Sequence, residues 1–396
     1  MFVSSGIATH PESIDVALRK AYHSAAENAA GDIACAFVFV SGLISDRQRE
    51  SVENALRDLT PGVPVFGCSA ESVIGSRQEL EWQSAASVLL VSGVAPFRIF
   101  PLECLRTPDG TAVIGYDEDI LQAARQCNGM AVVACPKSFS IDLFIDALTL
   151  DCDESQVPVI GGYSSSQDWN QANMLFCGDQ VLGSGAVGLV LPPGLEWRTI
   201  VSQGCRPIGD PMIVTALDGN RIMGLGGRPA LAMLREMFHR LPNHERAMAI
   251  EALLIGRAIN ENSSSFSHGD FLIRNVQGVD EESEAVVVTD RFQVGQTIRF
   301  HVRDEQAADS DFATLLERIS KREIDCQAAM LFSCNGRGNN MFEQKNHDAL
   351  AIDKYFPGLP LAGFFAAGEF APIGNRNLTH GFTAVSAFLC KSSQEL

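Results

Sequence analysis

The chain contains the phrases VPVFGCSAESVIG at residues 63–75, VPVIGGYSSSQ at residues 157–167 and LPLAGFFAAGEFAPIG at residues 359–374. Each phrase has an apolar residue, a proline, two small or apolar residues and a glycine, followed by a loop of small or polar residues. A short apolar run precedes each phrase, and the three runs are AFVFVSG from Ala36, MAVVAC from Met130 and AAMLFSC from Ala328. Recurrence of the same pattern three times indicates an internal duplication.

One copy of this pattern predicts a strand, a helix and a second strand. The AFVFV run is β-branched and aromatic and is apolar on both faces, which is typical of a strand in a sheet covered on both sides. Residues 46–59 carry a single apolar stripe and predict a helix, which the following Pro61-Gly62 ends. A strand–helix–strand unit implies a parallel, right-handed pair. Further strands beginning near Ser84, Gly183 and His380 are expected to return antiparallel, so the predicted sheets are mixed.

A different block separates the second and third copies. Residues 212–223 predict two strands around an Asp218-Gly219 turn, residues 253–304 predict an antiparallel β-meander, and residues 309–322 predict a helix. The predicted fold is therefore α/β, with repeated strand-helix-strand units in mixed sheets covered by helices and an inserted antiparallel β-meander. We expect an N-terminal helical segment at residues 1–30 and two α/β domains at residues 31–200 and 201–396.

Composition excludes some classes of partner. The 396 residues include 30 Lys and Arg against 48 Asp and Glu, so the formal net charge is −18. This charge argues against nucleic acid and against an anionic membrane surface as partners. The 11 cysteines are odd in number and form no C-x-x-C, which favours free thiols over a disulfide framework or a zinc ribbon. With no signal peptide and no long apolar run evident, we expect a cytoplasmic protein.

The chain resembles the FIST family, which pairs a FIST-N with a FIST-C domain. The resemblance covers about residues 30–390 and is carried in the N-terminal half by VPVFGCSAE and VPVIGGYSS. The C-terminal half matches at QGCRPIG from Gln203, LGGRPAL from Leu225, GDFLIRNVQGVD from Gly269 and QTIRFHVRD from Gln296. Its most specific matches are LFSCNGRGNNMF from Leu331 and LAGFFAAGEFAPIG from Leu361.

This resemblance implies a non-catalytic sensory module of intracellular signal transduction that binds a small ligand, with an amino acid as one ligand class. Two kinds of relative supply alternatives. One is an F-box substrate receptor, which suggests a protein-protein interaction module, although the chain has no room for an F-box before the first repeat. The other is a nitric-oxide sensor that binds haem, but its C-terminal phrases differ from those here. We expect no cofactor, with haem as the alternative, and leave the signalling partner and the oligomeric state open.

The loop after the third apolar run has the composition of a ligand-binding loop. Glycines in Asn335-Gly336-Arg337-Gly338 let backbone N–H groups approach an anion, and a helix is predicted to follow from Met341. Arg337 could bind a ligand carboxylate, and Glu369, at the end of a predicted strand, could bind its amine. The structural alternative is that Arg337 forms an internal bridge with Glu369 or Asp353.

If the three copies pack around a shared centre, their loops converge there. The equally weighted alternative is that the small residues merely permit close crossing of the chain. Cys68 as a nucleophile lacks a recognisable base, so a structural role is favoured. The histidines include no H-x-x-x-H pair, and we predict no metal site. The predicted ligand-binding residues are Cys68, Ser69, Glu71, Ser164, Ser165, Cys334, Asn335, Arg337, Glu369 and His380.

Overall fold

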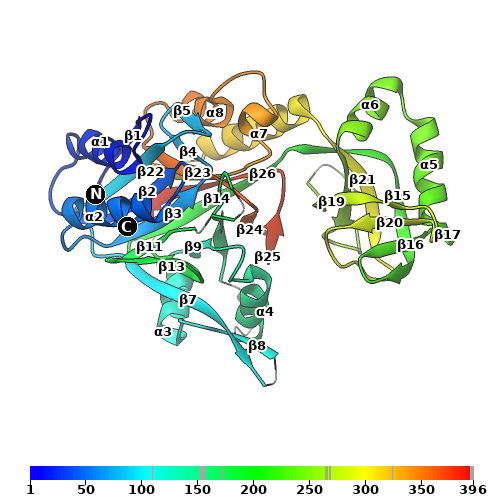
Figure 1. The fold of residues 1–396 in the computed structure, drawn as a ribbon, viewed down its shortest axis with the longest axis horizontal. Coiled ribbons are helices and arrows are strands. Elements are labelled where there is room, and N and C mark those ends of the chain that lie inside the picture. Colours follow the sequence, from blue (N-terminus) through cyan, green and yellow to red (C-terminus); the bar gives the residue numbers. More distant parts are fainter. Residues whose placement is uncertain are drawn as a thin grey trace. The chain divides into compact units, whose positions relative to one another are not determined.

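Three copies of one unit account for three of the four sheets in the computed structural model (Figure 1). Each copy has two parallel strands joined by a helix, as predicted. The elements of the first copy are β2 (Ile33–Ser41), α2 (Asp46–Leu59) and β3 (Val65–Ala70). Those of the second are β9 (Met130–Ala134), α4 (Ile141–Asp151) and β10 (Val159–Tyr163). Those of the third are β22 (Cys326–Cys334), α8 (His347–Tyr355) and β23 (Leu361–Ala366).

A strand returns antiparallel beside the first strand of each copy, so the sheets are mixed as expected. These strands are β6 (Ala85–Ser92), β13 (Ala186–Val190) and β26 (Thr383–Lys391). Beyond each of them lies a strand that precedes the copy in sequence, namely β1 (Phe2–Thr9), β7 (Arg98–Thr107) with β8 (Gly110–Ile114), and β14 (Leu195–Gln203). A helix then leads into each copy, namely α1 (Ile14–Ala26), α3 (Glu118–Gln126) and α7 (Glu305–Ser320). The predicted helical segment 1–30 therefore begins with a strand.

The hairpin that follows each second strand belongs to the sheet of another copy. The hairpins are β4 (Ser72–Gly75) with β5 (Gln78–Glu81), β11 (Leu175–Gly178) with β12 (Gln180–Leu182), and β24 (Glu369–Ile373) with β25 (Arg376–His380). The first copy's hairpin extends the third copy's sheet, the second copy's extends the first, and the third copy's extends the second. This cyclic exchange of hairpins brings the loop after each second strand towards a different copy.

The glycine of each repeated phrase marks a close crossing of two strands. A Cβ atom on Gly67 or Gly161 would lie 1.8 Å from a backbone oxygen of the neighbouring strand, and one on Gly363 would lie 2.0 Å away. No side chain fits at that distance, so glycine is required where the second strand of each copy meets the first.

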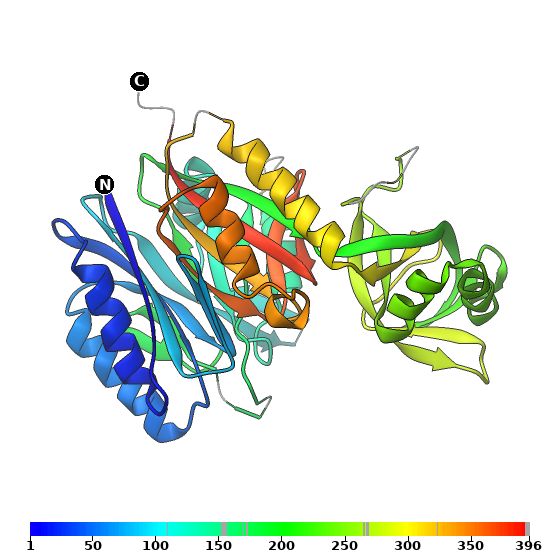
Figure 2. The same ribbon diagram turned by 90° about the horizontal axis from the view of Figure 1, so that it is seen from above.

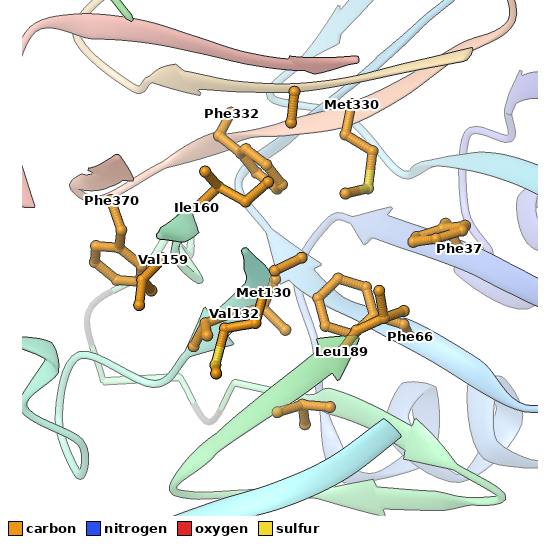
Figure 3. Packing of buried hydrophobic residues seen from close by; sticks show 14 of the residues in the cluster. Phe37, Phe66, Met130, Val132, Val159, Ile160, Leu189, Met330, Phe332 and Phe370 are labelled. Atoms are coloured by element: carbon orange, nitrogen blue, oxygen red, sulfur yellow. The ribbon is translucent and has the colours of Figure 1, made fainter. Parts of the chain in front are cut away.

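The core lies where the faces of the three repeated sheets meet. Figure 3 shows side chains from all three copies pointing towards one another, including Phe37, Val132 and Phe332. Alternate residues of β2 and β6 point the other way and pack under α1 and α2, which cover the outer face of their sheet (Figure 2). Because successive side chains of a strand point to opposite faces, β2 and β6 contribute to one core on each face of their sheet, as expected for a sheet buried on both faces.

The fourth sheet forms a closed ring of six antiparallel strands with a short seventh at its side. The strand order is β15-β21-β18-β19-β20-β16-β17, and a further pairing of β15 with β16 closes the ring. Helices α5 (Ala230–Arg240) and α6 (Asn243–Glu251) pack on it. Of the meander predicted over residues 253–304, β18–β20 are present, but the last predicted strand, β21, pairs with β18 and β15 and does not continue beyond β20. The strands are β15 (Cys205–Asp218), β16 (Arg221–Leu225), β17 (Arg228–Pro229), β18 (Leu253–Ala258), β19 (Phe271–Asp280), β20 (Ala285–Val288) and β21 (Thr297–Arg303).

The structure describes residues 1–392 except 109, 152–156, 169, 172, 264, 265, 267, 268 and 323. These residues form two compact units. The first comprises Met1–Val201, Ala313–Thr379 and Thr383–Leu396, and the second comprises Ser202–Phe312 and His380–Phe382. The ring of strands is thus inserted into the third copy, between β14 and α7, so residues 201–396 are shared between the two units. Among the described residues, no helix is both long and apolar enough to cross a membrane.

Candidate functional site

Loops from all three copies meet at Glu71, Ser165 and Asn335, which we call the loop junction. The Glu71 backbone N–H donates to Ser165 Oγ at 3.0 Å, and the Ser165 hydroxyl donates to the Phe365 carbonyl. The Asn335 backbone N–H donates to the Ala366 carbonyl at 2.9 Å, and its side chain hydrogen-bonds the Glu71 carboxyl group. The cyclic exchange of hairpins thus brings one predicted ligand-binding residue from each copy into a single cluster.

Glu71 is the titratable group of the loop junction. Its side chain is partly exposed, and burial raises its pKa to about 7, against the opposing hydrogen bond from Asn335 and with a further contribution from nearby Glu81. The carboxyl group therefore exchanges its proton near neutral pH, so a ligand can meet it either charged or neutral.

Arg337 lies fully buried in an internal ion pair. Its Nε is 2.9 Å and its Nη2 is 2.7 Å from the two carboxylate oxygens of Asp348. Burial acts to raise the pKa of Asp348, but the Arg337 guanidinium and the hydrogen bond with His347 hold that pKa well below its usual range. His347 stacks on Phe342 with ring centroids 3.6 Å apart, and Arg337 lies over the same ring at 5.1 Å. This bidentate geometry is the one in which guanidinium recognises a carboxylate.

Two expectations for this segment were wrong. The internal bridge from Arg337 was expected to reach Glu369 or Asp353, but the partner is Asp348, and Asp353 instead lies 3.3 Å from Arg77. A helix was expected from Met341, but a short 3-10 helix spans Gly338–Asn340 and α8 begins only at His347. The helix begins later than expected for a local reason. Asn346, directly before α8, has a left-handed backbone conformation with φ 62°, which a helix cannot include.

Carboxyl groups of the chain occupy the positions at which the glycine loop and the following helix were expected to receive an anion. The Glu81 carboxylate accepts from the Asn339 backbone N–H at 3.0 and 3.2 Å. Glu79 Oε1 accepts from the Ala349 backbone N–H at 2.9 Å, in the first turn of α8. Both glutamates lie on β5, which the first copy contributes to this sheet. The favourable sites at these two helix N-termini are therefore filled from within the chain.

Glu369 forms a second buried carboxyl site. The Thr383 hydroxyl donates to Glu369 Oε2 at 2.6 Å, the Thr383 backbone N–H donates to it at 3.3 Å, and Cys334 supplies a side-chain hydrogen bond. Full burial raises the pKa of Glu369 to about 8, although these hydrogen bonds and Arg337 act in the opposite direction. The group is therefore mainly protonated at neutral pH.

The other predicted site residues have structural surroundings. Cys68 is fully buried, and burial raises the pKa of its thiol well above the usual range, so it stays protonated and unreactive. Ser69 Oγ accepts from the Met174 backbone N–H at 2.9 Å. The Ser164 hydroxyl donates to the Ala134 carbonyl at 3.1 Å. His380 is grouped with the second unit, whereas the other nine predicted residues belong to the first.

Sequence reasoning missed Asp348, Glu79 and Glu81. Asp348 follows a histidine in the first turn of a helix, where an acidic residue is usually explained by the helix dipole alone. Glu79 and Glu81 alternate along a short strand, which is the usual pattern of a solvent-facing side, although Glu79 is buried. Only the exchange of the β4–β5 hairpin reveals their role.

No group of three or more histidine, cysteine, aspartate or glutamate side chains among the described residues could hold a metal ion. His301 is buried on β21, with its Nδ1 2.9 Å from the Arg299 carbonyl and its ring packed edge-on against Phe271. These contacts hold the imidazole inside the second unit.

Two cavities lie away from the loop junction. One of about 170 Å³ lies between α2 and the β11–β12 hairpin. The other, of about 330 Å³, lies beside the first residues of β22 and the last of β26. Neither lining includes Glu71 or Arg337.

Comparison with known proteins identifies the family of the chain. The FIST N domain matches residues 34–228, and the FIST C domain matches residues 230–372. The uncharacterized protein Mb0898c of Mycobacterium bovis is 38% identical over 388 residues, which are 98% of this chain and 98% of that protein. The uncharacterized protein Rv0628c of Mycobacterium tuberculosis is 37% identical over 388 residues, 98% of this chain and 99% of that protein. The chain therefore belongs to the FIST family, whose domains are sensory domains of signal-transduction proteins.

Proposed function

We propose that this protein is a cytoplasmic sensor of a small ligand that carries an amino group and a carboxylate, an amino acid being the simplest example. The observation that carries the proposal is the convergence of Glu71, Ser165 and Asn335 from three separate copies. A ligand at such a junction contacts every copy at once, so its binding energy can act on their arrangement. The ten described cysteines are free thiols, which supports the cytoplasmic location.

In this proposal Glu71 binds the ligand's ammonium group. The carboxylate of the ligand competes with Glu81 for the Asn339 backbone N–H, which is the more accessible of the two internal carboxylate contacts. Arg337 stays with Asp348 and supports the loop. This revises the initial assignment, in which Arg337 held the ligand carboxylate and Glu369 held the amine, because both of those side chains are fully buried.

Displacing Glu81 would also produce the signal. Glu81 lies on the β4–β5 hairpin, and its contact with the glycine loop ties the first copy's hairpin to the third copy. A ligand that replaces this contact favours the conformation in which the hairpin is released, and a signalling partner can bind that conformation preferentially. The ligand shifts the equilibrium only by its difference in affinity for the two conformations.

A thermal-shift panel tests the binding step. The panel contains amino acids together with matched amines and carboxylic acids that each lack one of the two groups. We expect stabilisation only by compounds carrying both groups, by about 2.7 kcal/mol when the ligand is at 100 times its dissociation constant. Affinity should rise with pH through about 7, because ionisation of Glu71 creates the charge that attracts the ammonium group.

Glu71→Gln is the decisive variant, with Glu50→Gln at an exposed position of α2 as its control. The first should abolish both the stabilisation and its pH dependence, and the second should leave them intact. An undiminished response of Glu71→Gln would refute the proposed site. Absence of stabilisation by any compound in the panel would refute the ligand class.

One observation favours a second candidate function. Glu79, Glu81 and Asp348 already bind the hydrogen-bond donors of Ala349, Asn339 and Arg337. The segment is therefore fully hydrogen-bonded at these positions without a ligand, which is expected of a protein-protein interaction module. Affinity capture with the purified chain discriminates the two functions. Recovery of one stoichiometric partner whose binding is indifferent to the compound panel supports the interaction module, and a compound-dependent partner supports the sensor.

A further inference from the structure

Two cysteines lie directly opposite each other on neighbouring strands of the first unit. Cys326 is the first residue of β22 and pairs in register with Cys390, near the end of β26. Their sulfur atoms are 3.3 Å apart. Opposed residues of an antiparallel pair have Cα atoms about 4.5–5.5 Å apart, which lies within the range that a disulfide spans. The backbone thus already holds the two residues at bonding separation.

The two thiols differ in accessibility and in acidity. Cys326 is partly exposed, whereas Cys390 is fully buried. A hydrogen bond from the Cys390 thiol lowers the pKa of Cys326, and Arg198 contributes in the same direction, while burial and Asp325 oppose them. The pKa of Cys390 is raised by the same hydrogen bond and by burial. This asymmetry makes Cys326 the attacking thiolate and Cys390 the resolving thiol.

A cationic cavity adjoins this pair. The cavity of about 330 Å³ is lined by three basic side chains, Arg198, Arg322 and Lys391, and by two acidic ones, so its formal charge is positive in a chain of net charge −18. Asp325 and Lys391 are the sequence neighbours of the two cysteines and pair with each other at 2.8 Å. Arg322 is exposed and available to a small anion. The surroundings of the dithiol therefore favour an anionic reactant.

We propose that Cys326 and Cys390 form a redox-active dithiol that exchanges with small disulfides carrying carboxylate groups. The Cys326 thiolate attacks one sulfur of the disulfide, forming a mixed disulfide and releasing one small thiolate, which takes up the proton that Cys326 lost. Cys390 then gives its proton to water and attacks the Cys326 sulfur, which expels the second small thiolate. The small disulfide is reduced to two thiols, and the protein gains one disulfide between β22 and β26.

Glutathione disulfide is the probe for this proposal, applied to the full chain. Peptide mapping should show a Cys326–Cys390 linkage, with the intact protein losing the mass of two hydrogen atoms. In Cys390→Ser the reaction should stop at a glutathione adduct on Cys326. Cys326→Ser should leave Cys390 unmodified because Cys390 is buried. Cys104→Ser, which removes another partly exposed thiol, should react as the unaltered protein does.

The unaltered protein also supplies a test that needs no variant. Mapped by site, Cys326 should react at least about tenfold faster than Cys104, because its thiolate is favoured. Equal rates at these two cysteines, or a Cys390→Ser protein without the adduct, would overturn the proposal.

The anionic class is tested separately with neutral hydroxyethyl disulfide. Arg322→Ala should slow the reaction with glutathione disulfide by about two- to fivefold and leave the neutral reaction unchanged. Arg47→Ala, an exposed position on α2, should change neither rate. If Arg322→Ala slowed the reactions with glutathione disulfide and with hydroxyethyl disulfide equally, the proposal that the dithiol prefers anionic disulfides would be refuted.

Discussion

Replacing Glu369 by glutamine should make the protein more stable at neutral and mildly alkaline pH. Glutamine has nearly the same shape, and its carbonyl oxygen can accept both hydrogen bonds from Thr383. It differs in that it cannot ionise. In the folded chain Glu369 holds its proton because full burial raises its pKa to about 8, whereas the unfolded chain releases the proton above about 4.5. Folding therefore requires proton uptake by this side chain between those two pH values.

The sign and size of the effect follow from proton linkage. The stabilisation linked to the raised pKa of Glu369 is fully present below pH 4.5 and is lost as the pH rises through about 8. The loss amounts to about 1.4 kcal/mol of unfolding free energy for each pH unit between these limits. From pH 5 to pH 7.5, the stability of Glu369→Gln relative to the unaltered protein should therefore rise by about 3 kcal/mol.

Urea unfolding at several pH values measures this difference. Fluorescence of Trp197, which is buried in the first unit, reports the transition of the unit that contains Glu369. Other titrating groups cancel when the two proteins are compared at each pH. Glu12→Gln, at an exposed position, should track the unaltered protein throughout. A stability difference that does not change with pH would refute the assignment of a buried, protonated carboxyl group to Glu369.

Two further stability predictions concern the strand crossings and the buried ion pair. Gly161→Ala should cost at least about 3 kcal/mol of unfolding free energy, because its Cβ would lie 1.8 Å from the Val132 oxygen at φ 147°. The control, Gly178→Ala, has φ 66° and no atom within 4 Å of the added Cβ, and should cost only about 1–2 kcal/mol in the same urea titration. Equal costs would contradict the crossing argument. Arg337→Met should cost about 3–5 kcal/mol because it leaves Asp348 charged and buried. Adding Asp348→Asn should recover much of the lost melting temperature, and a double variant no more stable than the single would count against this account.

The repeat phrases predicted the architecture of a copy because their information is local. The Pro-x-x-Gly pattern reflects a strand start and a close crossing, and both are properties of a few consecutive residues. The helix Asp46–Leu59 was predicted at its exact bounds, because its apolar stripe ends at a proline-glycine turn. The predicted α/β class with an inserted meander is confirmed for the same reason.

The partners within the site could not be predicted, because they depend on contacts between copies. The alternating pattern of β5 predicts that Glu79 and Glu81 share a face of the strand. It does not predict which sheet the strand joins. From the sequence alone, several carboxylates are equally plausible partners for Arg337. Only the position of α8 in the fold shows that Asp348 is the partner. The meeting of Glu71 with Asn335 likewise requires the exchange of hairpins.

The cyclic exchange of hairpins also constrains how the chain can be made. During synthesis from the N-terminus, β4 and β5 emerge early, yet their partner β23 is among the last strands to leave the ribosome. The early β4–β5 hairpin and the β10 edge of the second copy's sheet therefore stay unpaired until translation is nearly complete, and unpaired edges invite association with other chains. A chain stopped after the second copy leaves β10 without β24 and the early hairpin without a sheet. Premature termination should thus yield an aggregation-prone fragment rather than a shorter working protein.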